Sequence, residues 1–258
     1  MDLIKFFPLL VFATLLIAEV FTGHLSRQRG DHAEKLLAWG SYLQQAAVVR
    51  PIIAFLLAAI AGLLAPDSVD SLSHLPFWPV FFAYLLSREL MQYWYHRFSH
   101  EWPWLWKLHR THHSARQMNV LVTSRGNLAW FLLMPTLYFE AWVIYVGLTG
   151  PYLLAYAVLA FVSISSHSGL RWDLPLLAHP LTSPLMRRLQ YVITLPDTHH
   201  AHHGMGPESN PNGNYAPLFF FYDVLFKTAK NPIARQSAVG IDDAETAPWW
   251  RQLWSPRG

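Results

Sequence analysis

Eight histidines recur at spacings that suit a metal site, and a ninth stands apart from them. The pattern HxxHH occurs at 109–113 and again at 199–203, and an HxxxH pair occupies 96–100. Residues at i, i+3 and i+4 lie on one face of a helix, so each motif can direct several imidazole nitrogens to a single point. The predicted metal ligands are His96, His100, His109, His112, His113, His167, His199, His202 and His203.

Nine imidazoles exceed what one ion accepts, so they predict two metal ions with four or five ligands each. Imidazole suits iron, zinc, copper and nickel, whereas magnesium and calcium prefer carboxylates, which the motifs lack. A zinc peptidase of the HExxH class has a glutamate after its first ligand, but Arg97, Arg110 and His200 occupy that position here. A transporter would place its ligands within the spans and not beyond their ends. Activation of O2 by two iron ions is therefore the favoured chemistry.

The composition indicates that a bilayer is the solvent. Of the 258 residues, 53% are hydrophobic, 15% aromatic and only 14% charged, which is more apolar than an average soluble domain. The lack of cysteine excludes disulfides, iron–sulfur clusters, thiolate–zinc sites and cysteine nucleophiles within this chain. The basic residues behind the net charge of +3 flank apolar runs, so we expect no nucleic-acid partner.

Five apolar runs are candidates to cross a hydrocarbon core of about 30 Å. They cover residues 3–21, 51–65, 76–95, 128–147 and 151–166. The first run is interpreted as a span and not as a cleaved signal peptide, because it lacks a basic leader and Thr22-Gly23-His24 is a poor cleavage site. The second run is short unless residues 46–49 extend it. Residues 31–49 mix charged and apolar side chains, which favours an interfacial helix over a span.

The distribution of Lys and Arg predicts the orientation of these spans. A hairpin through the membrane around residues 147–151 returns the chain to the face it left, so His167 joins the other histidines. Excess positive charge near span ends stays in the cytoplasm. With an external N-terminus and five crossings, all basic segments and the histidine site share the cytoplasmic side. The basic residues that follow the first span are Arg27, Arg29, Lys35 and Arg50.

These expectations combine into an all-α fold: a multi-span transmembrane helical bundle with a cytoplasmic helical cap that carries a histidine-rich di-metal site. We expect one integral-membrane domain over residues 1–258. Within it, 1–75 hold two spans and an interfacial helix, 76–228 form the catalytic core and 229–258 form an interfacial tail. Trp249, Trp250 and Trp254 in the tail are typical of an interfacial aromatic anchor.

The first histidine segment resembles the sterol desaturase / fatty acid hydroxylase superfamily of integral-membrane di-iron oxidases. The resemblance rests on the pattern Tyr93-Trp94-x-His96-Arg97-x-x-His100-x-x-Pro103-x-Leu105-Trp106-x-x-His109-Arg110-x-His112-His113-Ser114. Its later motifs are similar to His167-Ser168, Pro196-x-x-His199-x-x-His202-His203, Asn212-x-Asn214-Tyr215-Ala216 and Asp223-x-Leu225-Phe226-Lys227-Thr228. The resemblance covers roughly residues 89–228. It departs from the family pattern at 125–127, where Arg-x-His-Pro is common, and in the long connection from His167 to His199.

The resemblance implies two iron ions, O2 as cosubstrate and a lipid substrate that is hydroxylated or desaturated. Electrons must come from an external reductase, ferredoxin or cytochrome, because the chain has no cysteine, haem motif or glycine-rich nucleotide loop. An alternative is a zinc membrane protein in which the histidines serve a hydrolytic or structural role, and zinc can also replace iron in a purified sample.

Polar residues near the motifs are candidates to orient the imidazoles by hydrogen bonding to their second nitrogen. These candidates are Glu89, Asp197, His200, Asn214 and Asp223. His200 points about 100° away from the face shared by its neighbours, so we expect a hydrogen-bonding role and not a metal ligand. His179, in the long connection, is a candidate for an additional ligand.

Overall fold

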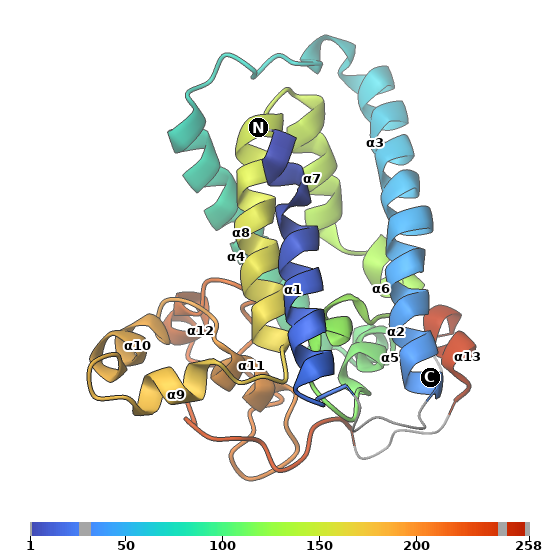
Figure 1. The fold of residues 1–258 in the computed structure, drawn as a ribbon. Helices are drawn as coiled ribbons and strands as arrows, with labels where there is room; N and C mark the ends of the chain where they lie inside the picture. The colour runs from blue at the N-terminus through green and yellow to red at the C-terminus, as the bar shows by residue number, and fades with distance from the viewer. Residues whose placement is uncertain (1, 26–31, 242–246, 256–258) are drawn as a thin grey trace.

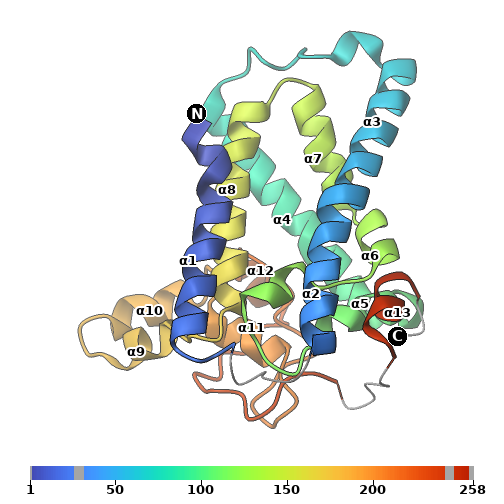
Figure 2. The same ribbon diagram turned by 45° about the vertical axis from the view of Figure 1, so that its right-hand side comes forward.

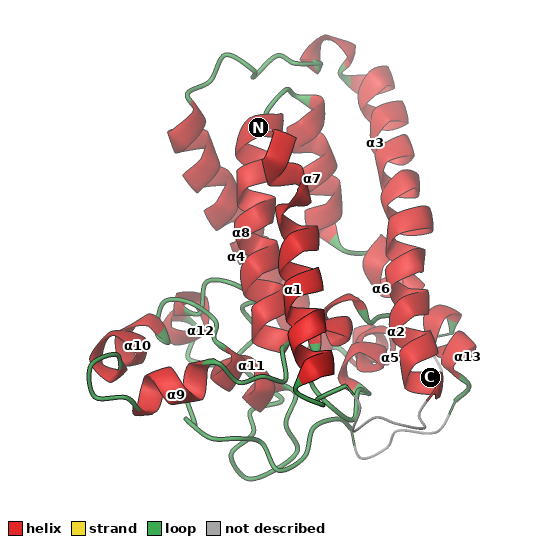
Figure 3. Ribbon diagram, viewed as in Figure 1, coloured by secondary structure: helices red, strands yellow, loops and turns green. Residues whose placement is uncertain are grey.

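Regular secondary structure in the part of the chain described here is helical, as Figure 3 shows. The structure is a computed structural model that describes residues 2–25, 32–241 and 247–255. Besides the helices, these residues contain an isolated β-bridge between Gly204 and Val239. The predicted all-α fold is therefore confirmed, while Arg27 and Arg29 lie outside the described residues.

The first two helical segments carry the N-terminal apolar runs. A 3₁₀ turn, Asp2–Phe6, leads into α1 (Phe7–Phe21). After it, α2 (His32–Gln44), a π-helical turn (Gln45–Val49) and α3 (Arg50–Leu64) form one uninterrupted helical stretch.

The expected boundary between an interfacial helix and a second span is therefore wrong. Pro51 has no N–H, and its ring would clash with the carbonyl of residue 47 in a regular helix. The π-helical turn just before Pro51, closed by a hydrogen bond from Arg50 N–H to the Gln45 carbonyl, lets the helix continue. The 33-residue stretch is about 50 Å long, so it exceeds the hydrocarbon core.

Two helices joined at a proline carry the first five histidines. α4 (Phe77–Glu101) ends with His96 and His100 in its last turns, and Trp102 has an extended conformation. Pro103 then starts α5 (Pro103–His113), where its missing N–H leaves no partner unsatisfied. The chain reverses at this junction, so α5 packs back against the end of α4.

The predicted span 128–147 is interrupted. α6 (Leu128–Leu132) begins where the Asn127 side chain accepts a 2.9 Å hydrogen bond from Ala129 N–H. Pro135 starts a separate helix, α7 (Pro135–Tyr145), because a proline cannot continue the preceding helix. α8 (Thr149–His167) then returns, ending in His167 as the hairpin predicts.

The loop between α7 and α8 packs against the segment that precedes α4. Asp70 N–H and Leu72 N–H donate to the carbonyls of Tyr145 and Val146 at 3.1 and 3.0 Å. Gly147 has a φ of +90°, and a Cβ there would lie 2.9 Å from the Cα of Asp70. Position 147 therefore requires glycine. It lies at the end of the bundle farthest from the histidines.

Three helical stretches are long and apolar enough to cross a membrane: Ile4–Phe21, His32–Leu64 and Thr149–His167. Of the other two expected spans, α4 carries many polar residues and α7 has only 11 residues. In Figures 1 and 2, α1, α4 and α8 run toward the histidine end of the bundle, and α2–α3 and α7 run away from it. The side of the bilayer on which this end lies stays a prediction.

Short helices gather at the histidine end of the bundle (Figure 1). They are α9 (Asp173–Ala178), α10 (Ser183–Leu189), α11 (Pro196–His202), α12 (Phe221–Leu225) and α13 (Trp249–Trp254). α13 packs on α2, with Leu253 buried and its carbonyl 3.4 Å from the Gln44 side-chain nitrogen. Trp250 and Trp254 stay exposed, which fits the predicted aromatic anchor.

Candidate metal centre

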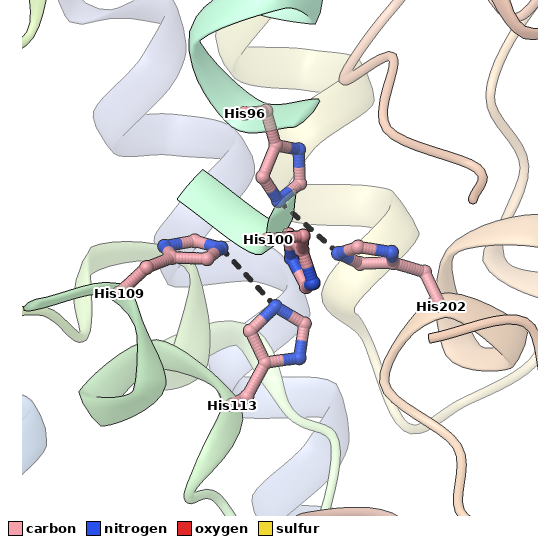
Figure 4. A group of neighbouring side chains, drawn as sticks. All are labelled: His96, His100, His109, His113 and His202. Atoms are coloured by element: carbon pink, nitrogen blue, oxygen red, sulfur yellow. Dashed lines mark hydrogen bonds between the residues drawn. The ribbon is translucent and has the colours of Figure 1, made fainter. Parts of the chain in front are cut away.

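The structure brings all nine predicted imidazoles together in two adjoining groups. Within each group, one nitrogen of every histidine lies within 4.8 Å of the others. The five-histidine group, drawn in Figure 4, consists of His96, His100, His109, His113 and His202. The four-histidine group consists of His112, His167, His199 and His203. The numbers of donors match the predicted four or five per ion.

Each HxxHH triplet is divided between the two groups. In α5, His109 and His113 belong to the five-histidine group, whereas His112 belongs to the other. In α11 the division is reversed, because His199 and His203 join the four-histidine group and His202 joins the five. The expectation that all three imidazoles of one HxxHH triplet converge on a single point is therefore wrong. The helix fixes which rings share a face, and the neighbouring helices decide which centre each ring reaches.

In the five-histidine group, backbone carbonyls fix the tautomers of two rings. Nδ1 of His96 donates to the Tyr215 carbonyl at 2.6 Å, and Nδ1 of His202 donates to the Gly213 carbonyl at 2.7 Å. Each Nε2 is then an unprotonated acceptor. These two Nε2 atoms nevertheless face each other at 3.1 Å (Figure 4). Two lone pairs at this distance need a cation between them.

The four-histidine group repeats this arrangement. Nδ1 of His112 donates to the Arg125 carbonyl at 3.1 Å, and Nδ1 of His167 donates to the Ser163 carbonyl at 2.7 Å. The two Nε2 atoms lie 3.5 Å apart. Both groups therefore present converging lone pairs, as a metal-ligating imidazole with a hydrogen-bonded second nitrogen does.

Several buried ring nitrogens have no hydrogen-bond partner among the described residues. Within the two groups they are Nε2 of His100, Nδ1 of His109 and both nitrogens of His203, and Nε2 of the neighbouring His200 also has none. Burial, reinforced by the neighbouring imidazoles, lowers the pKa of His109, His113, His199 and His203 well below the usual range. Neutral imidazoles are the form that binds metal, so the donor set fits a pair of ions.

A cavity of about 400 Å³ extends from the histidines into the bundle. Its histidine end is lined by rings from both groups, including His96, His109 and His167. Apolar side chains of α1, α6, α7, α8 and the α6–α7 junction line much of the remaining wall, among them Leu9, Phe12, Phe131, Met134, Leu137, Leu159 and Ile164. This shape suits an elongated apolar molecule with one part held at the metal centre.

A family model for fatty acid hydroxylases matches residues 81–228. The chain belongs to the fatty acid hydroxylase family. The resemblance seen in the sequence motifs is thereby confirmed. An alkylglycerol monooxygenase from Danio rerio is 27% identical over 193 residues, covering 70% of this fatty acid hydroxylase family member and 40% of the relative. The chain thus spans well under half of that relative's length. No solved structure matches this chain.

In this fatty acid hydroxylase family member, Asp223 and Asn214 act through the backbone and not on an imidazole directly. The Asp223 carboxylate accepts hydrogen bonds from Tyr215 N–H and Ala216 N–H, both at 2.8 Å. Asn214, at a φ of +55°, donates to the Thr198 carbonyl at 2.8 Å. Together they hold the loop whose carbonyls orient His96 and His202. Backbone carbonyls replace the carboxylates expected in this role.

Asp197 and Glu89 likewise bind other partners. Asp197 accepts from Arg171 at 3.0 Å and from the backbone N–H groups of Ile233 and Ala234, which ties the C-terminal segment to the start of α11. Glu89 is fully buried and accepts from Arg88 at 2.6 Å. Seven residues place Glu89 about 10 Å from His96 along α4, so the expected contact with an imidazole is wrong.

The two remaining histidine candidates lie outside both groups. His200 is buried and forms a hydrogen bond with the backbone of Ser168, in keeping with its expected role as a neighbour. His179 is exposed at the end of α9, where its Nδ1 accepts from Leu181 N–H at 3.3 Å. The structure therefore gives no support to His179 as an additional ligand.

Two positioning residues escaped sequence analysis. Glu19 of α1 is fully buried and accepts from Ser168 Oγ and Gly169 N–H, both at 2.8 Å, just after His167. A lone carboxylate within the apolar run 3–21 was the available signal. Arg125, whose carbonyl orients His112, is held by Glu34 and by the Thr111 carbonyl at 2.9 Å. Nothing in the spacing predicts that contact.

Proposed function

We propose that this chain is a membrane-bound di-iron oxygenase that hydroxylates or desaturates a lipid, with its histidine end facing the cytoplasm. The observation that carries the proposal is the pair of adjoining imidazole groups at one end of a largely apolar cavity. The fatty acid hydroxylase family and the similarity to an alkylglycerol monooxygenase support an oxygenase that acts on lipids.

The overall reaction requires O2 and two external electrons. In hydroxylation, one oxygen atom enters a C–H bond, and the other leaves as water with two protons. In desaturation, two neighbouring carbons each lose a hydrogen and both oxygen atoms leave as water. When bound, two iron ions supply the redox chemistry that splits O2. A reductase, ferredoxin or cytochrome that docks on the protein is the expected electron donor.

The chain's own residues orient the ligands and exclude water. The carbonyls of Tyr215 and Gly213 hold two Nδ1–H groups, so the Nε2 lone pairs stay aimed at the centre. The apolar wall keeps bulk water away from the reacting carbon and leaves the substrate little room to turn. Carbonyl anchors of this kind preorganise the donors before any ion arrives.

The decisive experiment removes one histidine from each group in cells that make the protein. His112→Ala and His202→Ala should abolish a lipid product detected by mass spectrometry as a gain of one oxygen or a loss of two hydrogens. His179→Ala, outside both groups, should leave the product unchanged. Product that persists in both variants overturns the proposal, as does protein from iron-replete cells that binds only zinc and forms no product with O2 and reductant.

A further inference from the structure

A layer of polar side chains crosses the bundle within the apolar part of the cavity. Arg50 of α3, Arg88 of α4, Glu140 of α7 and Tyr156 of α8 all line the cavity that reaches the histidines. Charged groups at this depth are costly in a bilayer and usually serve a function.

Arg88 is neutralised within the protein. Its Nη1 donates to Glu89 at 2.6 Å, and its Nε and Nη2 donate to Glu140 at 3.2 and 3.1 Å. Glu140 therefore pairs with an arginine and not with the tyrosine or tryptophan groups that are the simplest partners for a carboxylate within a span. These three residues form a closed ion-pair network, so Arg88 has little capacity left for a ligand.

Arg50 lies in a different environment. Its guanidinium carbon lies 5.5 Å from the centre of the Tyr156 ring, and it forms a hydrogen bond with Tyr152. Among the residues that the structure describes, no carboxylate forms an ion pair with Arg50 within 4.0 Å. Its side chain is exposed although it lies midway along the 33-residue helical stretch that could cross a membrane. Several of its five N–H donors are thus available to a ligand.

The charges on the cavity wall favour an anion. The lining includes four cationic side chains, of Lys5, Arg50, Arg88 and Arg125, but one carboxylate, of Glu140. Arg88 and Arg125 are paired with glutamates, which leaves Arg50 as the arginine whose charge is least compensated. A guanidinium in an apolar wall binds carboxylate or phosphate oxygens through two parallel hydrogen bonds.

The layer lies at a defined distance from the metal centre. Arg88 precedes His96 by eight residues on α4, or about 12 Å, and Tyr156 precedes His167 by eleven residues on α8, or about 16 Å. Apolar wall residues such as Met134, Leu137 and Leu159 occupy the interval. A volume of about 400 Å³ is at the lower end of the range for small-molecule sites, which suits a single chain.

We propose that Arg50 anchors a subsite for the anionic head of a single-chain amphiphile, a carboxylate or a phosphate, whose carbon chain extends to the histidines. This inference rests on the proposed function for the role of the chain, but binding of the head does not require turnover. The head is held within the bundle by Arg50, and the distance from this layer to the histidines selects which carbon is oxidised.

The test measures equilibrium binding to the purified full-length protein without reductant, so that no turnover occurs. Radiolabelled hexadecanoic acid is competed with hexadecyl phosphate and with hexadecanol, which share one chain length and differ in the head. In the wild-type protein, at least one of the two anions should bind at least about 10-fold more tightly than the alcohol. Whichever of hexadecanoic acid and hexadecyl phosphate binds more tightly identifies carboxylate or phosphate as the preferred head.

Substitutions at Arg50 test whether this residue causes the preference for an anionic head over an alcohol. Arg50→Gln should remove about 10-fold in anion affinity and leave hexadecanol unchanged, and Arg50→Lys should retain part of the preference. Arg187→Gln, an exposed arginine of α10, is the matched control and should change nothing. Equal binding of acid, phosphate and alcohol to the wild-type protein overturns the proposal, even if Arg50→Gln does not fold. Equal weakening of all three ligands by Arg50→Gln also overturns it.

Failure of this inference is distinguishable from failure of the proposed function. Head-group selectivity without an oxidised product supports the subsite and contradicts the oxygenase. An oxidised product from a protein that binds acid, phosphate and alcohol equally supports the oxygenase and overturns the subsite.

Discussion

The two histidine groups differ in how the protein holds them. In the five-histidine group, the hydrogen-bonded rings of His96 and His202 both depend on one loop, through the carbonyls of Tyr215 and Gly213. In the four-histidine group, the anchoring carbonyls belong to Arg125 and to Ser163, which lies within α8 itself. One centre therefore has more donors but relies on a single loop, whereas the other has fewer donors anchored on separate elements.

The largest expected effect separates the groups by donor number. His203→Ala leaves three donors in its group, so the iron content should fall by about half and product formation by on the order of 100-fold or more. His100→Ala leaves four donors and, unlike His202→Ala, keeps both carbonyl-anchored rings of its group, His96 and His202, so both ions should remain and activity should fall by only about 10-fold. Metal analysis of each purified variant, with product yield, checks this. A smaller loss of iron and product in His203→Ala than in His100→Ala would contradict the expected order.

A second test addresses the loop of the five-histidine group. Asp223→Asn removes one of the oxygens that hold Tyr215 N–H and Ala216 N–H, so His96 and His202 should lose orientation. Activity should fall by about 10-fold, the lower end of the range for a ligand's supporting partner. The matched control is Glu208→Gln, which removes the charge of an exposed carboxylate and should have no effect. Unchanged kinetics in Asp223→Asn would show that the loop does not control the centre.

The corresponding change beside the four-histidine group should have a smaller effect. Glu34→Gln weakens the ion pair that holds Arg125, but Arg125 keeps its hydrogen bonds to the Thr111 carbonyl and to Ser114 Oγ. Activity should therefore fall by less than about 10-fold. Turnover at saturating substrate, measured side by side for Glu34→Gln and Asp223→Asn, shows which variant loses more activity. A larger loss in Glu34→Gln would indicate that the Arg125 segment is the weaker support.

The smallest expected effect on catalysis is at the opposite end of the bundle. Gly147→Ala forces a residue with a φ of +90° against the Cα of Asp70, which should destabilise the fold by roughly 1–3 kcal/mol. Iron content and activity per folded chain should not change. Gly62→Ala, where nothing lies within 4 Å of the new Cβ, should stabilise α3 by about 1 kcal/mol or less. Thermal unfolding in detergent measures both, and an activity loss in Gly147→Ala would couple the two ends.

The sequence predicted the histidines far better than their assignment to centres. Spacing at i, i+3 and i+4 identified His109, His112 and His113 because helical geometry is local. Their division between two groups depends on where α4, α8 and the α11 segment place their own rings around those of α5, which no local pattern encodes. The same limit explains Asp223, whose position after the last motif was evident but whose contact with a loop backbone was not.

The helices were predicted with similar limits. Apolar length located α1 and α8 because hydropathy is a property of the segment itself. The mixed composition of 31–49 suggested a separate interfacial helix, whereas the π-helical turn before Pro51 joins it to α3. Pro135 was visible in the run 128–147, but its effect on the helix was underestimated. The positive charge of Arg50 predicts a position at the membrane boundary, and only the packing of α3 against α7, with Arg50 over the Tyr156 ring of α8, places it on the cavity wall.

The division of each triplet has a consequence for how the two centres can diverge. Inserting one residue before His109 within α5 would rotate all three of its rings by about 100° and disrupt both histidine groups together. Both α5 and α11 carry histidines of each centre. Neither selection nor a protein engineer could therefore change one of these helices without affecting both centres. A protein of this design that retains one ion and discards the other must lose it by replacing individual histidines, not by remodelling a helix.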